Sequence, residues 1–208
     1  MSNRRLFIRS AALAGAAAVL ISGGVVAQAA FTKVPAEVQA GTYKLDASHG
    51  KITYKISHLG FSTYVGQFTG VDATLTLDPA NPSASTLTAT VPISGHDDTS
   101  AGLKTHLQTP DFFDAAQFPT ATFVAKTITV DSDDATEADV VGDLTLHGVT
   151  KPVTLEVKFN QAGEMRGAYR VGFDGETTIK RSEFGMSYGL PAIGDEVELH
   201  IEGEFVKQ

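Results

Sequence analysis

Hydrophobic and polar side chains alternate with a period of two along most of the chain beyond residue 50. The alternation covers seven segments, which are residues 51–56, 71–77, 86–93, 139–146, 153–159, 169–174 and 196–205. In the first segment, Ile52, Tyr54 and Ile56 alternate with lysine and threonine. This pattern is typical of β-strands that bury one face and expose the other to water, as in antiparallel sheets. We therefore predict an all-β domain.

Hairpin-sized connections separate several of these strands, for example at residues 147–150 and 161–164. A sheet of about eight such strands has to protect its edges, and closure into a barrel removes them. A two-layer sandwich fits the same alternation. We favour an antiparallel β-barrel.

One segment breaks the alternation. Leu103 and Leu107 lie four residues apart within residues 99–107, which begin with Thr and Ser and precede Pro110. This spacing predicts a short helix that ends before the proline. An aromatic loop over residues 111–119 follows, and we expect helix and loop near one mouth of the barrel.

The first 29 residues have the layout of an export signal. Three arginines, two of them adjacent, precede a small apolar run (residues 11–26) and an Ala-Gln-Ala triplet (residues 27–29) that is typical of a cleavage site. The run is shorter than the ~20 residues that a membrane span needs. We predict a signal peptide over 1–29 of the twin-arginine type, with an ordinary secretory signal as the alternative. The mature domain is then 30–208, in the periplasm or outside the cell.

Composition and charge exclude several classes of protein. The chain has no cysteine, which excludes disulfides, thiolate metal sites and a cysteine nucleophile. All 24 acidic residues but only 13 of the 16 basic residues lie in 30–208, so the net charge of that domain is −11. A nucleic-acid-binding protein needs a basic face, and we exclude nucleic acid as a partner. The sequence sets no oligomeric state, and a dimer is compatible with it.

A barrel of about eight strands either fills itself with side chains or holds one small ligand. The inward-facing residues are apolar, so a cavity would favour a long lipid tail. The candidate tail-binding residues are Ile52, Tyr54, Ile56, Leu75, Leu87, Val91, Phe123, Leu144, Leu155, Val157, Tyr169, Phe173, Leu199 and Ile201. A solid core made of the same side chains is the alternative, and alternation alone does not separate the two.

Polar residues near strand ends are candidates for a head-group site. His58 and Arg181 continue the inward-facing sets of their strands, and His106 lies in the expected helix. A ligand with a tail and a head needs a few polar groups at the mouth of an apolar tube, and these three suit that mouth. In the alternative interpretation, Arg181 forms a buried ion pair with Asp195 or Glu183, and His58 caps a turn.

The sequence shows no recognisable catalytic or metal-binding motif. It has no H-E-x-x-H, no G-x-S-x-G and no Walker-type loop, and its six histidines lack metal-ligand spacing. We therefore assign no catalytic and no metal-binding residue. Two alternatives stay open. One is a small lipid-modifying hydrolase or isomerase, with His58 or His106 oriented by Asp111 or Asp46. The other is a secreted structural module with a solid core.

Short motifs follow one another in order along nearly the whole mature domain. They are YKLD (43–46), SHGKI (48–52), SHLGFS (57–62), GQF (66–68), HLQTPDFFD (106–114), FPTATF (118–123), GDLTLHGVTKP (142–152), IKRSEFG (179–185) and IGDEV (193–197). As a set they resemble the YceI-like, polyisoprenoid-binding family. Two positions depart from its usual pattern, since Gly50 stands where serine is frequent and Val71 where an aromatic residue is frequent.

The resemblance implies an extended, lipocalin-like barrel whose elongated cavity binds a long isoprenoid chain. Polyprenyl and quinone-tailed lipids are the ligands it implies, and it implies no cofactor other than such a bound lipid or quinone. We expect a binding protein, used for storage or transport, that contacts a membrane transiently. Because the domain is strongly acidic, we favour a neutral, quinone-like head over a diphosphate.

Overall fold

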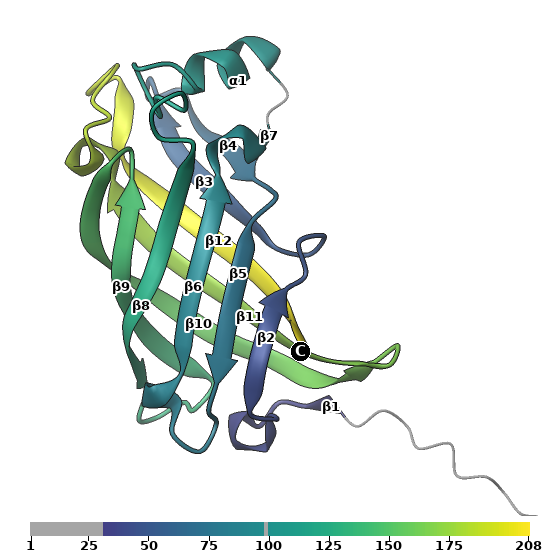
Figure 1. The fold of residues 1–208 in the computed structure, drawn as a ribbon. Helices are drawn as coiled ribbons and strands as arrows, with labels where there is room; N and C mark the ends of the chain where they lie inside the picture. The colour runs from purple at the N-terminus through teal and green to yellow at the C-terminus, as the bar shows by residue number, and fades with distance from the viewer. Residues whose placement is uncertain (1–30, 98–99) are drawn as a thin grey trace, which may run out of the picture.

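The computed structural model describes residues 31–97 and 100–208, and the predicted signal peptide over 1–29 lies outside the described residues. The chain is mostly β-strand, wrapped into a barrel with one short helix at one end (Figure 1). The strands are β1 (Phe31–Thr32), β2 (Gly41–Leu45), β3 (Lys51–His58), β4 (Ser62–Phe68), β5 (Asp72–Leu77), β6 (Thr86–Pro92), β7 (His96–Asp97), β8 (Thr120–Val130), β9 (Glu137–Leu146), β10 (Val149–Met165), β11 (Ala168–Lys180) and β12 (Ile193–Lys207). The helical elements are α1 (Ala101–Leu107) and the 3-10 turns η1 (Pro35–Glu37), η2 (Pro82–Ala84), η3 (Ile93–Gly95) and η4 (Arg181–Phe184).

Eight antiparallel strands close the barrel in the order β10, β9, β8, β6, β5, β2, β12 and β11. The ring closes because β11 pairs with β10 on one side and with β12 on the other. On its other side β12 pairs with two strands: residues 205–207 pair with β2, and residues 193–202 pair with β3. The closed antiparallel barrel predicted from the alternation is confirmed, and the two-layer sandwich is not the fold.

Two expected connections had different outcomes. The turn near 147–150 is confirmed, because Leu146 pairs with Val149 across a two-residue turn. The expected connection at 161–164 is wrong, because these residues belong to β10 and pair with β11. The chain turns instead at Arg166 and Gly167, which have φ angles of 54° and 79°. Backbone of this left-handed kind suits a tight hairpin turn and favours glycine.

Register shifts explain why the alternation did not reveal β8 and revealed only part of β10. In β8 the pairing shifts between Ala125 and Thr127. In β10 it shifts between Phe159 and Gln161, which leaves Ala162 only 2% exposed. A bulge moves the inward-facing set by one residue, so a strict period of two ends there although the strand continues.

The predicted short helix is confirmed as α1. Its start is capped by Ser100, whose Oγ accepts a hydrogen bond from the Leu103 amide at 3.3 Å. This is the usual role of serine before a helix. The aromatic loop that follows brings the Phe113 ring edge-on to Phe68, with ring centroids 5.5 Å apart. Helix and loop thus lie at one end of the barrel, at the top of Figure 1.

The barrel interior near α1 is filled by the protein's own side chains. Phe184 is 1% exposed and Ile93 is 2% exposed there. We call this region the filled end; its buried cluster consists of Tyr54, Phe68, Ile93, Ala121, Leu146, Ile179, Phe184 and Met186. Rings and branched side chains of several strands and of the loop after α1 pack together at this end.

An apolar cavity in the barrel as candidate functional site

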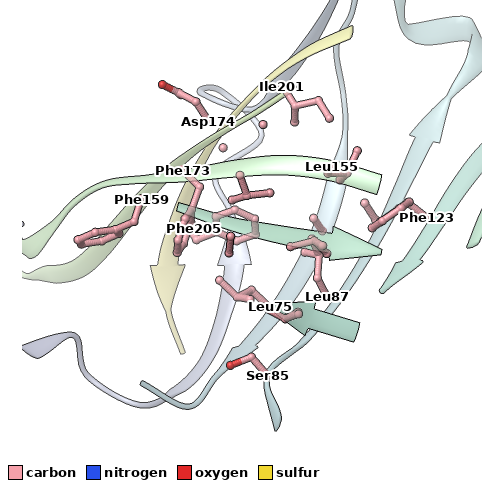
Figure 2. Close-up of a pocket in the computed structure, with 18 of the residues that line it drawn as sticks. Leu75, Ser85, Leu87, Phe123, Leu155, Phe159, Phe173, Asp174, Ile201 and Phe205 are labelled. Carbon is pink, nitrogen blue, oxygen red and sulfur yellow. The ribbon is translucent and has the colours of Figure 1, made fainter. Parts of the chain in front are cut away.

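An apolar cavity of about 370 Å³ lies in the part of the barrel away from α1. Its volume falls within the roughly 300–1,000 Å³ of typical small-molecule sites. The cavity is partly open, and its lining reaches η1, the turn that contains η2, and the β8–β9 turn, all at the bottom of Figure 1. We call this region the hollow end. Figure 2 shows Leu75, Leu87, Phe123 and Leu155 among the side chains that surround the space.

The filled end forms the floor of the cavity. Leu144 and Val153 line the cavity and also pack against the filled-end cluster. From this floor the lining follows β6 from Val91 to Ser85, which is about 20 Å at ~3.3 Å per residue. The cavity is therefore elongated along the strands, a shape that suits an extended chain better than a compact ligand.

Most of the residues predicted to contact a lipid tail line this cavity. These are Ile52, Leu75, Leu87, Val91, Phe123, Leu144, Leu155, Val157, Phe173, Leu199 and Ile201. Tyr54, Ile56 and Tyr169 are not among the lining residues. Their tail contact stays a prediction that this geometry does not favour.

The three exceptions face inward but pack against other side chains. Tyr54 belongs to the filled end, where its hydroxyl lies 2.8 Å from Nε2 of His96, and Ile56 packs against the same cluster. Tyr169 packs beside Tyr43, with ring centroids 6.5 Å apart. Burial and the neighbouring Tyr169 raise the pKa of Tyr43 to about 12. Alternation identified the inward direction of these residues, and their position along the barrel axis decides what they meet.

The alternation along the sequence does not identify the lining residues that come from turns. Pro35 and Ala36 of η1, Pro79 and Pro82 around η2, and Thr136 of the β8–β9 turn all border the cavity. Residues in turns have no period-two signal, so alternation does not find them. Prolines at both 3-10 turns are the one signal in the sequence that marks these elements.

Four ionisable residues border the cavity, namely Lys51, Glu137, Asp174 and Glu202. Asp174 is exposed, and Figure 2 shows its carboxylate pointing away from the apolar side chains. Glu202 pairs in register with Asp174 on β11 and with Lys51 on β3, so all three share the outer face of the sheet. The polar groups therefore lie around the cavity wall, and the interior is apolar.

The three head-group candidates lie near the filled end and not around this cavity. His58 is exposed and pairs with Ile193. His106 lies in α1, where its Nε2 is 3.0 Å from Asp111 and its ring contacts Tyr188. None of His58, His106 and Arg181 lines the cavity. Their contact with a head group stays a prediction that this geometry does not favour, because the inward parity of a residue does not say which end of the barrel is hollow.

Arg181 has a structural environment. It is 4% exposed, and its guanidinium donates hydrogen bonds to the backbone carbonyls of Met186, Tyr188, Ile193 and Gly194 at 2.7–3.0 Å. Burial lowers its pKa, and the nearby Asp195 acts in the opposite direction. These bonds tie the loop after β11 to the start of β12. The planar, five-donor head of arginine explains its use at this position.

A polar network fills the loop where β2 and β3 separate beside β12. The Arg170 guanidinium donates to Asp46 at 2.9 Å and also pairs with Glu204. Hydrogen bonds from Ser48 and Arg170 hold the pKa of Asp46 well below its usual range. Asp46, His49 and Glu204 present ligand atoms within 4.8 Å of one another, an arrangement that a cation could use. Because the Arg170 guanidinium bridges both carboxylates, this ion-pair network accounts for their proximity.

The same loop contains Ser, His and Asp side chains, which is the composition of a hydrolytic triad. Ser48 Oγ lies 3.0 Å from Nδ1 of His49, and Asp46 contacts that same nitrogen at 3.1 Å. In a working triad the serine and the aspartate meet opposite nitrogens of the ring, so that the histidine passes a proton between them. With both partners on Nδ1, this trio has no such relay.

The fold and the cavity together define a class, a lipocalin-like β-barrel with an internal apolar site. In the described part of the chain, no helix has the length and hydrophobicity that crossing a bilayer requires. The YceI-like domain matches residues 43–205. The chain therefore belongs to the YceI-like family, as the motifs indicated.

Similar proteins cover most of the chain. Protein YceI of Escherichia coli O157:H7 is 39% identical over 172 residues, which are 81% of this chain and 88% of that protein. A UPF0312 protein of Pseudomonas aeruginosa is 37% identical over 175 residues, covering 83% and 90%. Among solved structures, the YceI protein of Campylobacter jejuni superposes with a TM-score of 0.65 at 31% identity, covering 74% and 91%.

Two further structures extend the likeness. BcnA of Burkholderia cenocepacia has a TM-score of 0.67 at 26% identity, covering 79% of this chain and 99% of BcnA. A polyisoprenoid binding domain from Saccharophagus degradans has a TM-score of 0.61 at 13% identity, covering 82% and 100%. At that identity the second likeness shows a common fold.

Proposed function

We propose that this protein binds a long isoprenoid lipid, with a polyprenyl or quinone tail, in the cavity of the hollow end. It stores or carries that lipid in the periplasm or outside the cell. The observation that carries the proposal is the elongated, apolar, partly open cavity. Each methylene that leaves water for such a space contributes about 0.8 kcal/mol, so tail length supplies affinity. The shared fold of a polyisoprenoid binding domain supports the choice of guest.

Binding without catalysis fits this cavity. Its interior presents aliphatic and aromatic side chains, with Ser85 and Thr177 among the few hydroxyl groups on its lining. The His106–Asp111 pair, which an enzyme would need as a base and its partner, does not line the cavity. A carrier binds its lipid in a fixed ratio, whereas an enzyme releases product in excess over protein.

The cavity's open end has apolar surface that suits brief contact with a membrane. Phe31 is 53% exposed and Val34 is 50% exposed, and both lie within four residues of Pro35, which lines the cavity. A lipid tail that moves between a bilayer and the cavity then meets less water on its way. Transient contact of this end with a membrane is therefore part of the proposed function.

Organic extraction of the purified protein, followed by mass spectrometry, tests the proposed guest. We expect a polyprenyl or quinone-tailed species in near-stoichiometric amount. Leu87→Trp fills the cavity and should remove that species, whereas Val124→Trp on the outer face of β8 should keep it. Absence of any isoprenoid species from the unmodified protein, or equal amounts in both variants, contradicts the proposal.

The location is tested separately from the guest. We expect cell fractionation to recover a mature chain that begins at Ala30, with the mass that cleavage after Ala29 leaves. Replacing Arg4 and Arg5 by lysine should retain the precursor inside the cell if the twin-arginine route is used. Full export of that variant points to the ordinary secretory route, and an uncleaved cytoplasmic chain contradicts the proposed location.

A further inference from the structure

One glycine of the cavity wall leaves an unfilled recess. Gly175 lies on β11 between the inward-facing residues Phe173 and Thr177, and all three line the cavity. A Cβ placed on Gly175 would meet no side chain closer than Cβ of Ile201 at 3.6 Å, which is ordinary van der Waals contact. The backbone there has room for a side chain that the sequence does not supply.

Other glycines in this wall are covered by neighbouring rings. A Cβ on Gly142 would lie 2.4 Å from the Phe123 ring, and one on Gly203 would lie 2.8 Å from the Phe205 ring. In those places the missing side chain is replaced by an aromatic one. At Gly175 no ring takes the space, so the cavity widens there.

The widening brings the cavity into contact with the backbone of the wall. Asp174, whose side chain points outward, is nevertheless part of the lining. At this level the wall is one layer of main chain, bounded on the neighbouring strands by Val157 and Ile201, the register partners of Gly175. A guest at this level can therefore be wider than elsewhere in the tube.

We propose that Gly175 selects guests by their cross-section, because its recess receives a methyl branch of the bound chain. The inference rests on the proposed function and adds to it a residue that determines specificity. A straight alkyl chain passes the recess without entering it and leaves a void, which forfeits dispersion contacts along that part of the wall. A methyl-branched chain fills the recess and gains the transfer of that methyl group from water.

The test compares two alcohols that have the same saturated main chain. Phytanol carries methyl branches and cetyl alcohol carries none, and each displaces the neutral dye Nile red from the delipidated protein. Gly175→Leu fills the recess with protein atoms and Gly175→Ala fills part of it. Gly172→Leu is the matched control, because Gly172 precedes inward-facing Phe173 on the same strand and its added Cβ would meet nothing closer than 3.9 Å.

We expect the unmodified protein to bind phytanol more tightly than cetyl alcohol by about fourfold or more, the equivalent of one buried methyl group. Gly175→Leu should lower that preference about fourfold, which is the share of the one branch that enters the recess, Gly175→Ala should lower it less, and Gly172→Leu should retain it. Thermal unfolding reports whether each variant folds. If Gly175→Leu does not fold, the preference measured for Gly175→Ala tests the role of Gly175. If the Gly175 variants lose affinity equally for both alcohols, or keep the preference unchanged, the proposed role of Gly175 is overturned. Failure of the unmodified protein to bind either alcohol overturns the proposed function itself.

Discussion

The filled end and the hollow end of this barrel share strands but differ in the side chains that face one another. At the filled end, Tyr54 and Phe68 pack together on the neighbouring strands β3 and β4, and Phe113 of the loop after α1 packs edge-on against Phe68, with ring centroids 5.5–5.9 Å apart. At the hollow end the wall carries smaller residues such as Ala89 and Gly175. Its phenylalanines pack along the wall, since Phe173 contacts Phe159 and Phe205 on the adjacent strands.

This difference shows how one uniform strand pattern produces both a core and a binding site. Protein interiors are close-packed, so a region stays hollow only where the facing side chains are too short to meet. At the α1 end the ring of Phe113, from the loop after α1, packs onto Phe68 of the wall, whereas the phenylalanines of the other end pack along the wall. Four mutational experiments test this contrast, beginning with the largest expected effect.

The introduction of a buried charge should separate the two ends most strongly. Ile179→Glu places a carboxylate in the packed cluster of the filled end, and we expect a loss of about 5 kcal/mol or more of stability, or no folded protein. Leu155→Glu places the same group on the cavity wall, where water can enter from the open end, and should cost about 2 kcal/mol while abolishing lipid binding. Urea unfolding and lipid extraction measure both effects. Equal destabilisation by the two substitutions contradicts the contrast.

Truncation of matched phenylalanines gives the next largest effect. Phe184→Ala should cost about 3–5 kcal/mol, because it opens a void in a packed cluster. Phe173→Ala should cost about 1–2 kcal/mol, because one side of that ring already faces the cavity. Both values come from chemical denaturation of delipidated protein. If Phe173→Ala loses more stability than Phe184→Ala, the hollow end is packed and the contrast is contradicted.

Replacement of Arg181 tests whether this residue supports the loop or selects a head group. Arg181→Lys should destabilise the protein by about 3 kcal/mol, because an ammonium group does not reach all four carbonyls that the guanidinium binds. Relative affinities for lipids with different heads should stay unchanged, as measured by competition. A change in head-group preference in a stably folded variant would restore Arg181 as a ligand contact.

The smallest expected effect is a pH dependence at the hollow end. The pKa of Tyr43 rises from 10.0 to about 12 in the folded protein, because burial favours the neutral phenol. Its contribution to stability is complete below about pH 10 and is lost as the pH rises through about 12. Tyr43→Phe should cost about 1 kcal/mol of stability at neutral pH, because it removes the hydrogen bond to Gln39. The free energy of unfolding of this variant should fall less steeply with rising pH than that of the unmodified protein. Parallel curves of unfolding free energy against pH for the two proteins would contradict a raised pKa of Tyr43.

The sequence predicted the strands well because half-buried antiparallel strands have a period of two. It also predicted the inward direction of Tyr54, Tyr169 and Arg181, all of which face the interior or the filled core. The predicted strand was too short where a bulge occurs, as between Phe159 and Gln161, because a single extra residue ends the alternation without ending the strand.

The candidate site was predicted only in part, for a physical reason. Alternation gives the direction of a side chain relative to the sheet but not the side chain that faces it from the opposite wall. Leu155 and Ile179 are equivalent in the pattern, yet one faces the cavity and the other lies in the filled core. The turn residues Pro35 and Pro82, which border the cavity, have no periodic signal at all.

Crystallography of the delipidated protein under xenon pressure tests the central claim most directly, because xenon enters empty apolar cavities. We predict xenon density between Leu87, Phe123 and Leu155, and none inside the cluster of Tyr54, Ile179 and Phe184. The account is contradicted if side chains occupy the space between Leu87 and Leu155 and xenon is absent from it.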